Sequence, residues 1–156
     1  MRKYFFFLSI FLIFYACSNS RVIKHDSKRT KNVNLSVNEV YAWVNYMPGE
    51  NAVPLFRISG DLTVKKSSEY DLKSISLSKI VVYQDTMVVY NIKPVIKENE
   101  KESNLNKRNM LFNLLKGLEL NENLDIDKKI DVEFVFEYEN KYFTYFINNI
   151  GIEKTY

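Results

Sequence analysis

One run near the end of the chain alternates apolar and charged side chains, and it constrains the fold more than any other feature. Val132, Phe134 and Phe136 occupy every second position, with Glu133 between the first two and Glu137 after the third. Successive side chains of a strand point to opposite faces, so this period of two predicts a strand with one buried face. A helix would need apolar residues at a spacing of 3.6, which the run does not offer.

Similar patterns recur along much of the chain, separated by turn residues. In one of them Ile75, Leu77, Val81 and Tyr83 are predicted to share the buried face. They predict seven strands, at residues 37–46, 55–65, 74–84, 87–92, 110–115, 131–138 and 142–148. Regularly spaced short strands over about 120 residues resemble an immunoglobulin-like or fibronectin type III-like β-sandwich. The resemblance is architectural and implies an all-β fold, a single antiparallel β-sandwich domain spanning residues 35–156.

Residues 110–118 permit two interpretations. Their leucines fall at helical spacing, and Gly117 stands where a C-terminal helix cap would be. Met110, Phe112 and Leu114 also alternate as a strand would. We interpret the segment as a strand because the surrounding units are all strands, with a short helix as the alternative.

Short connections set the register that we expect. Asp85-Thr86 and Glu139-Asn140 each separate two β-rich runs, and Pro48-Gly49 suits a type II turn. A two-residue loop at Glu139-Asn140 predicts three cross-strand pairs, namely Phe136 with Phe143, Phe134 with Tyr145 and Val132 with Ile147.

Two further positions in the predicted strands stand out. Gly60 falls on the apolar side of its strand, which predicts a bulge or a close approach of another backbone. Trp43, the single tryptophan, is predicted to lie in the core, with stacking against a ligand as the alternative.

The N-terminus has the organisation of an export signal. Arg2 and Lys3 precede a nearly unbroken apolar run over residues 4–16, and Cys17-Ser18 follows. An uncleaved membrane anchor needs about 20 apolar residues, and this run is shorter.

The junction resembles a bacterial lipoprotein signal. Ala16 and Cys17 match that motif, whereas Phe14 and Tyr15 depart from it. The resemblance implies a diacylglycerol on Cys17 and removal of residues 1–16. An uncleaved anchor and a secretory signal with an incidental cysteine are the alternatives.

Residues 17–34 are polar and basic, and we interpret them as a flexible tether. Ser18 in place of an aspartate implies sorting to the outer membrane, facing the periplasm, if the source is Gram-negative. Without Arg2 and Lys3 the chain holds 20 basic and 19 acidic side chains, so no nucleic-acid footprint remains. The expected partners are the membrane, through the lipid, and a protein or glycan of the envelope.

The residue inventory argues against most catalytic chemistry. His25 is the single histidine and Cys17 the single cysteine, so neither a Ser-His-Asp nor a Cys-His arrangement can be assembled. Zinc sites built from these residue types fail for the same reason. We therefore predict a binding or structural module that is not an enzyme, with no cofactor and no metal.

An acidic segment supplies the alternative function. Asn121, Asn123, Asp125 and Asp127 place oxygen atoms at every second position, but the segment lacks the glycine of a helix-loop-helix calcium site. We interpret it as a polar connection. A small envelope hydrolase using carboxylates of residues 119–127 (Glu119, Glu122, Asp125 and Asp127) is the competing hypothesis.

The outward side of the last predicted hairpin is the candidate partner-binding surface. Val135, Tyr142 and Phe146 would share this side with Glu133, Glu137 and Thr144. Apolar groups on a solvent-facing sheet can mark an interaction site. The alternative is that neighbouring loops cover them.

Overall fold

The computed structural model describes residues 34–47, 53–66 and 70–156. The described residues do not include the predicted leader, Cys17, most of the predicted tether or the predicted turn at Pro48-Gly49. The statements about them stay predictions. In the part of the chain that is described, no helix has the length and apolar character needed to cross a membrane.

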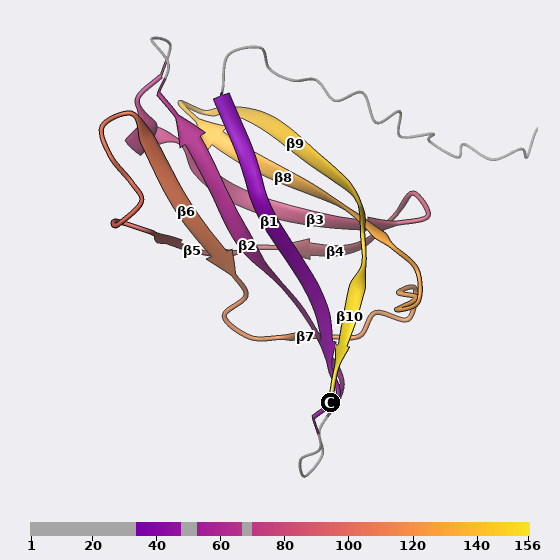
Figure 1. Cartoon of the computed structure of the whole chain (residues 1–156). Coiled ribbons are helices and arrows are strands. Elements are labelled where there is room, and N and C mark those ends of the chain that lie inside the picture. The colour runs from indigo at the N-terminus through magenta and orange to yellow at the C-terminus, as the bar shows by residue number, and fades with distance from the viewer. Residues whose placement is uncertain (1–33, 48–52, 67–69) are drawn as a thin grey trace, which may run out of the picture.

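Two β-sheets pack face to face, which confirms the all-β prediction (Figure 1). One sheet has the order β10-β1-β2-β6-β5, with β7 paired to β2, and the other has the order β4-β3-β8-β9. All pairings are antiparallel except β1 with β10, which is parallel. The strands are β1 (Asn34–Asn45), β2 (Leu55–Lys65), β3 (Ser76–Gln84), β4 (Met87–Ile92), β5 (Val95–Glu98), β6 (Lys107–Asn113), β7 (Leu118–Glu119), β8 (Ile130–Tyr138), β9 (Lys141–Ile150) and β10 (Ile152–Thr155).

The described residues form ten strands where the sequence predicts seven. β2 and β4 begin and end where predicted, and the strand interpretation of residues 110–113 is confirmed by β6. The three additional strands are β5 and β10, with four residues each, and β7, with two. Such short strands place at most two side chains on each face, too few to produce a visible alternation.

Residue 74 belongs to a short 3-10 helix, η1 (Leu72–Ser74), and not to the start of β3 as predicted. The Asp71 carboxylate accepts a 3.1 Å hydrogen bond from the backbone N–H of Lys73, which caps this turn. Local capping therefore overrides the alternating pattern at this point.

Aromatic rings join the two sheets through the core. Phe112 of β6 meets Phe134 of β8 edge to face, with ring centroids 5.3 Å apart. Phe56 of β2 stacks on Tyr90 of β4 at 4.6 Å. Phe56 and Phe134 are fully buried, so these contacts lie at the centre of the sandwich.

The β8–β9 hairpin has the predicted register. Phe136 pairs with Phe143, Phe134 with Tyr145 and Val132 with Ile147. Glu139 and Asn140 both have positive φ, 47° and 62°, as do Asp85 and Thr86 at 48° and 72°. Positive φ at both central residues is the property of type I′ turns, whose twist matches that of the flanking strands.

Gly60 lies where another chain segment comes close, as predicted. A Cβ at this position would be 2.1 Å from the carbonyl oxygen of Glu39 and 2.8 Å from the Phe112 ring. The register of β1 with β2 shifts between Val37 and Glu39, beside this contact. Any side chain here would force the two strands apart.

Trp43 is not a core residue, and that prediction is wrong. Its neighbours Ala42 and Val44 are 2% and 0% exposed, so the core-facing positions of this part of β1 are the even ones. Trp43 is half-buried on the outer side, beside Arg57 of β2 and Glu153 of β10. The sequence pattern does not show which face of β1 meets the core, because residues 40–46 carry apolar side chains on both faces. The pairing register of β1 decides which face is buried.

Candidate functional site

The predicted partner-binding residues lie together on the outer side of the sheet β4-β3-β8-β9. Val135 pairs with Thr144, and Phe146 pairs with Glu133, all with side chains directed away from the core. Val135 and Phe146 are half-buried, whereas Tyr142 is 64% exposed. The hairpin register thus brings these residues to one face.

Strand β3 adds Val81 and Tyr83 to this face, and the prediction that they lie on the core side with Ile75 and Leu77 is wrong, because a β-bulge between Leu77 and Lys79 turns them outward. Val81 and Tyr83 pair with Glu133 and Asp131 of β8 and are only 5% and 8% exposed, yet neither belongs to the core cluster. They are buried by their neighbours on the outer side, because β3 lies between β4 and β8. The uninterrupted apolar run at residues 80–83 is typical of a strand covered on both faces and could have revealed them.

The face has a polar pair near its centre. The Tyr83 hydroxyl donates a 2.6 Å hydrogen bond to Glu133 Oε2, and the Tyr83 ring lies 6.4 Å from that of Phe146. Burial, and then the hydrogen bond and charge of Glu133, raise the pKa of Tyr83 above its usual value near 10. Tyr83 therefore stays a neutral donor that holds the Glu133 carboxylate in place.

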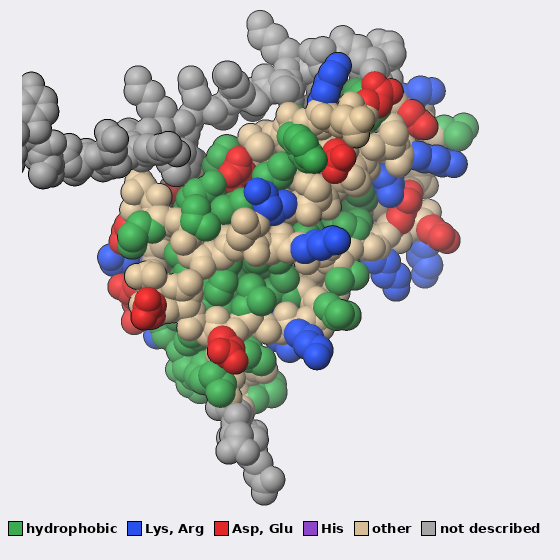
Figure 2. Space-filling model, turned by 180° about the vertical axis from the view of Figure 1, so that it is seen from behind, with side chains coloured by type: hydrophobic (Ala, Val, Ile, Leu, Met, Phe, Trp, Pro, Cys, Tyr) green, Lys and Arg blue, Asp and Glu red, His purple; other side chains and the backbone are tan. Residues whose placement is uncertain are grey.

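The apolar surface continues to the edge of the sheet at β4. Val88 pairs with Tyr83 and is 53% exposed. We call this surface the β3–β8 face and define it by Val81, Tyr83, Val88, Val135, Tyr142 and Phe146. In Figure 1 β3 and β4 lie behind β1 and β2, so Figure 2 shows this face, with hydrophobic side chains gathered in its middle and Lys, Asp and Glu side chains around them.

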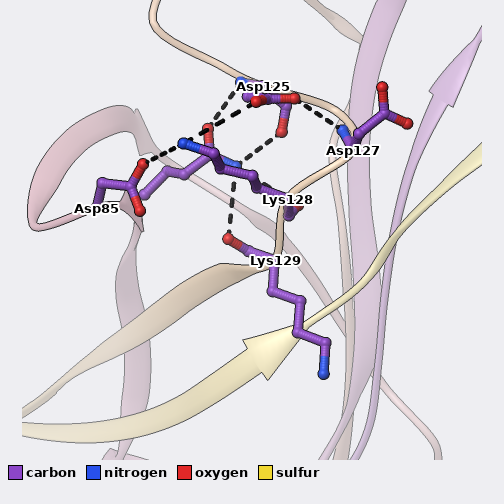
Figure 3. A network of polar contacts seen from close by, with 6 residues as sticks. Asp85, Asp125, Asp127, Lys128 and Lys129 are labelled. Atoms are coloured by element: carbon purple, nitrogen blue, oxygen red, sulfur yellow. Dashed lines mark hydrogen bonds and ion pairs between the residues drawn. The ribbon is translucent and has the colours of Figure 1, made fainter.

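The acidic segment of the alternative hypothesis is bound to the sandwich by polar contacts (Figure 3). Gln84, 3% exposed, accepts a 2.7 Å hydrogen bond from the Asp125 backbone N–H and donates a 2.8 Å bond to the Asp125 carbonyl. This reciprocal pair holds the loop against the end of β3.

Lysine side chains accompany the acids of this segment. Lys128 Nζ lies 2.8 Å from Asp85 and 4.0 Å from Asp125, and Lys154 Nζ lies 2.7 Å from Asp127. The hydrogen bond and charge of Asp85 raise the pKa of Lys128, and a hydrogen bond to Asp127 raises that of Lys154. The described carboxylates Asp125 and Asp127 thus take part in ion pairs that fasten the loop.

An open depression of about 430 Å³ lies beside this network. Asp85 and Asp131 line it together with Lys128 and Lys129, so its charges are mixed. Among the described residues, no group of three or more His, Cys, Asp or Glu side chains is arranged to hold a metal ion.

Comparison with protein-family models, with curated proteins and with solved structures finds no match to this chain.

The β3–β8 face is the surface on which the described residues favour an interaction. It combines apolar side chains on neighbouring strands with one fixed carboxylate near the centre. Such a surface can bury apolar area against a partner and accept a hydrogen bond from it. Chemistry on a bound substrate would need converging reactive groups, and Asp125 and Asp127 of the 119–127 segment instead take part in structural contacts.

Proposed function

We propose that this chain is a lipid-anchored protein of the bacterial cell envelope that binds another protein and does not catalyse a reaction. The β3–β8 face is its docking surface. The observation that carries the proposal is the exposure of Val88 and Tyr142, 53% and 64%, on the same outer side of the sheet as the apolar Val81 and Tyr83.

An antiparallel sheet with one solvated face normally shows polar side chains on that face. β3 departs from this rule, since Ile80 and Val82 face the core while Val81 and Tyr83 face outward. An apolar patch of several hundred Å² on a soluble domain marks an interaction site. The arrangement therefore supports a partner that covers the face.

The distribution of polar groups fits a protein interface. Lys79, Asn91 and Glu137 lie around the apolar side chains on the same side of the sheet. Specific interfaces combine an apolar centre with a polar rim, and tyrosines are enriched among the residues that dominate the binding energy. Tyr142, which is 64% exposed on this face, has the properties of such an anchor.

The anchor part of the proposal rests on the sequence around Cys17. Two or three acyl chains there would hold the domain on the membrane, since each buried CH₂ contributes about 0.8 kcal/mol. The tether would let the domain reach partners about 20–25 Å from the surface, by chain statistics for 17 flexible residues.

A pair of valine-to-lysine variants tests the docking surface. Val135→Lys places a charge on the β3–β8 face, and the control Val95→Lys places the same charge on β5 of the other sheet, where Val95 is 42% exposed. We expect in-cell crosslinking of the anchored full chain to lose its protein adduct with Val135→Lys and keep it with Val95→Lys. Both variants must show wild-type unfolding midpoints. An adduct that persists in folded Val135→Lys would contradict the proposal.

A further inference from the structure

The outer side of the other sheet carries two adjacent rows of side chains, one mainly aromatic and one polar. We call them the Trp43 strip. β1 presents Glu39, Tyr41 and Trp43, and β2 presents Asp61, Ser59 and Arg57, paired in that order across the two strands.

The aromatic row offers apolar surface to solvent. Tyr41 is 50% exposed and Trp43 is half-buried, and both alternate with core-facing residues of β1. Two positions along a strand are about 7 Å apart, so the two rings provide neighbouring platforms. The Tyr41 hydroxyl donates a 2.8 Å hydrogen bond to Glu39, which orients this ring.

The polar row has hydrogen-bonding capacity that the protein leaves unused. Asp61 Oδ1 is inaccessible to solvent and has no hydrogen-bond partner among the residues that the structure describes. A buried acceptor without a donor costs about 1–3 kcal/mol, and such a group in a native protein calls for an explanation. A ligand would supply a donor to Asp61 if the side chains around Oδ1 move apart when it binds.

A ligand that offers only hydrogen-bond donors would leave other groups of the polar row without partners. Arg57 is paired with Trp43 across the two strands, its Nε lies near Gly117 beside β7, and within the described ranges its guanidinium has neither a hydrogen-bonding nor an ionic partner. Ser59 stands between Arg57 and Asp61 with a hydroxyl that can both donate and accept. The strip therefore matches a ligand that presents donors and acceptors side by side and an apolar surface for the rings.

The charges of the strip discriminate between ligand classes. Glu39, Asp61 and Glu153 all act on the Tyr41 hydroxyl and raise its pKa, with Glu39 the largest cause, so an anionic ligand is disfavoured. A cationic peptide would be attracted by these acids and repelled by Arg57, so an oligolysine peptide is the competing ligand in the test below. A neutral ligand rich in hydroxyl groups meets neither obstacle.

We propose that the Trp43 strip binds a neutral oligosaccharide. The C–H faces of consecutive sugar rings would lie on Trp43 and Tyr41, while sugar hydroxyls donate to Asp61 and accept from Arg57. This site lies on the sheet opposite the β3–β8 face, so it does not depend on protein docking there.

The single tryptophan makes the test specific to the site, because its fluorescence reports on Trp43 alone. The full chain, purified in detergent, is titrated with xylohexaose, chitohexaose and maltohexaose, and separately with an oligolysine peptide. We expect at least one hexasaccharide to produce a saturable shift in emission. Asp61→Asn and Tyr41→Ala should each weaken its binding tenfold or more.

Matched controls lie on the other sheet. Asp85→Asn removes a carboxylate from the β3–β4 turn, and Tyr142→Ala removes an exposed tyrosine from β9, and both should keep wild-type affinity. The absence of a saturable shift with all three hexasaccharides would overturn the proposal. So would a shift with oligolysine alone, or equal affinities of Asp61→Asn and Asp85→Asn, both confirmed as folded by circular dichroism.

Discussion

The Tyr83 hydroxyl donates a 2.6 Å hydrogen bond to Glu133 on the side of β3 and β8 that faces away from the core. Tyr83 is 8% exposed, although it belongs to no core cluster. The pair fixes a carboxylate within an apolar surface, and a partner that covers this surface would meet an oriented acceptor. The Tyr83–Glu133 hydrogen bond thus connects the packing of β3 with the proposed docking surface.

Removal of the Tyr83 hydroxyl should lower stability in a pH-dependent way. Tyr83→Phe should reduce the free energy of unfolding by about 1 kcal/mol at pH 7, the net value of a typical hydrogen bond. Because the folded state raises the pKa of Tyr83, its contribution is fully present below the unfolded-state pKa near 10 and is lost as pH rises above it. Urea denaturation of both proteins at pH 7 and at several values above pH 10 should show a difference that shrinks with pH. A difference that grows instead would refute the assignment.

Core packing at Phe134 should dominate the stability of the sandwich. Phe134 is 0% exposed and contacts Phe112 across the two sheets. Phe134→Ala should cost about 3–5 kcal/mol, because it removes buried apolar surface and leaves a cavity. Glu137→Ala, on the outer side of the same strand, should change stability by no more than about 0.5 kcal/mol. Equal denaturation midpoints would show that the register of β8 is wrong.

The buried side chain of Gln84 should hold the loop that contains Asp125. Gln84→Ala leaves the Asp125 N–H and carbonyl without their partner and should cost about 2 kcal/mol. Amide hydrogen exchange at Asp125 should accelerate. Asp85→Asn removes only the exposed ion pair with Lys128 and keeps a residue suited to positive φ, so it should leave the unfolding midpoint nearly unchanged. Unchanged exchange at Asp125 in Gln84→Ala would count against this role.

The parts of the fold that the sequence predicted well are those with long, clean alternation. β8 and β9 carry alternating side chains over nine and ten residues and are joined by a two-residue turn, so both their faces and their register could be derived. β5 and β10 have four residues each and gain their place by pairing with β6 and β1, which no local pattern reveals.

The candidate sites, too, could be predicted only where the local pattern fixes the face and register of a strand. Val135, Tyr142 and Phe146 could be placed on one face because the hairpin register was predictable. Val81 and Tyr83 were assigned to the wrong face because their strand is apolar on both faces, and the prediction for Trp43 failed for the same reason in β1. Which face of such a strand meets the core depends on the opposite sheet.

The proposed lipid anchor is testable through Cys17, since the chain holds one cysteine. Cys17→Ser should move the protein from the membrane fraction to the soluble fraction or leave it unprocessed. Mass spectrometry of the wild type should show acylation at the new N-terminus. A Cys17→Ser protein that remains tightly membrane-bound and normally cleaved would rule out this anchor.

Site-specific photocrosslinking in cells tests the central claim most directly. A photoreactive phenylalanine analogue replaces Phe146 on the β3–β8 face or, as the control, Tyr41 on the opposite sheet. Irradiation should join the protein to a discrete protein partner from position 146 and not from position 41. No protein adduct at position 146, or the same adducts from both positions, would contradict the assignment of the β3–β8 face as the docking surface.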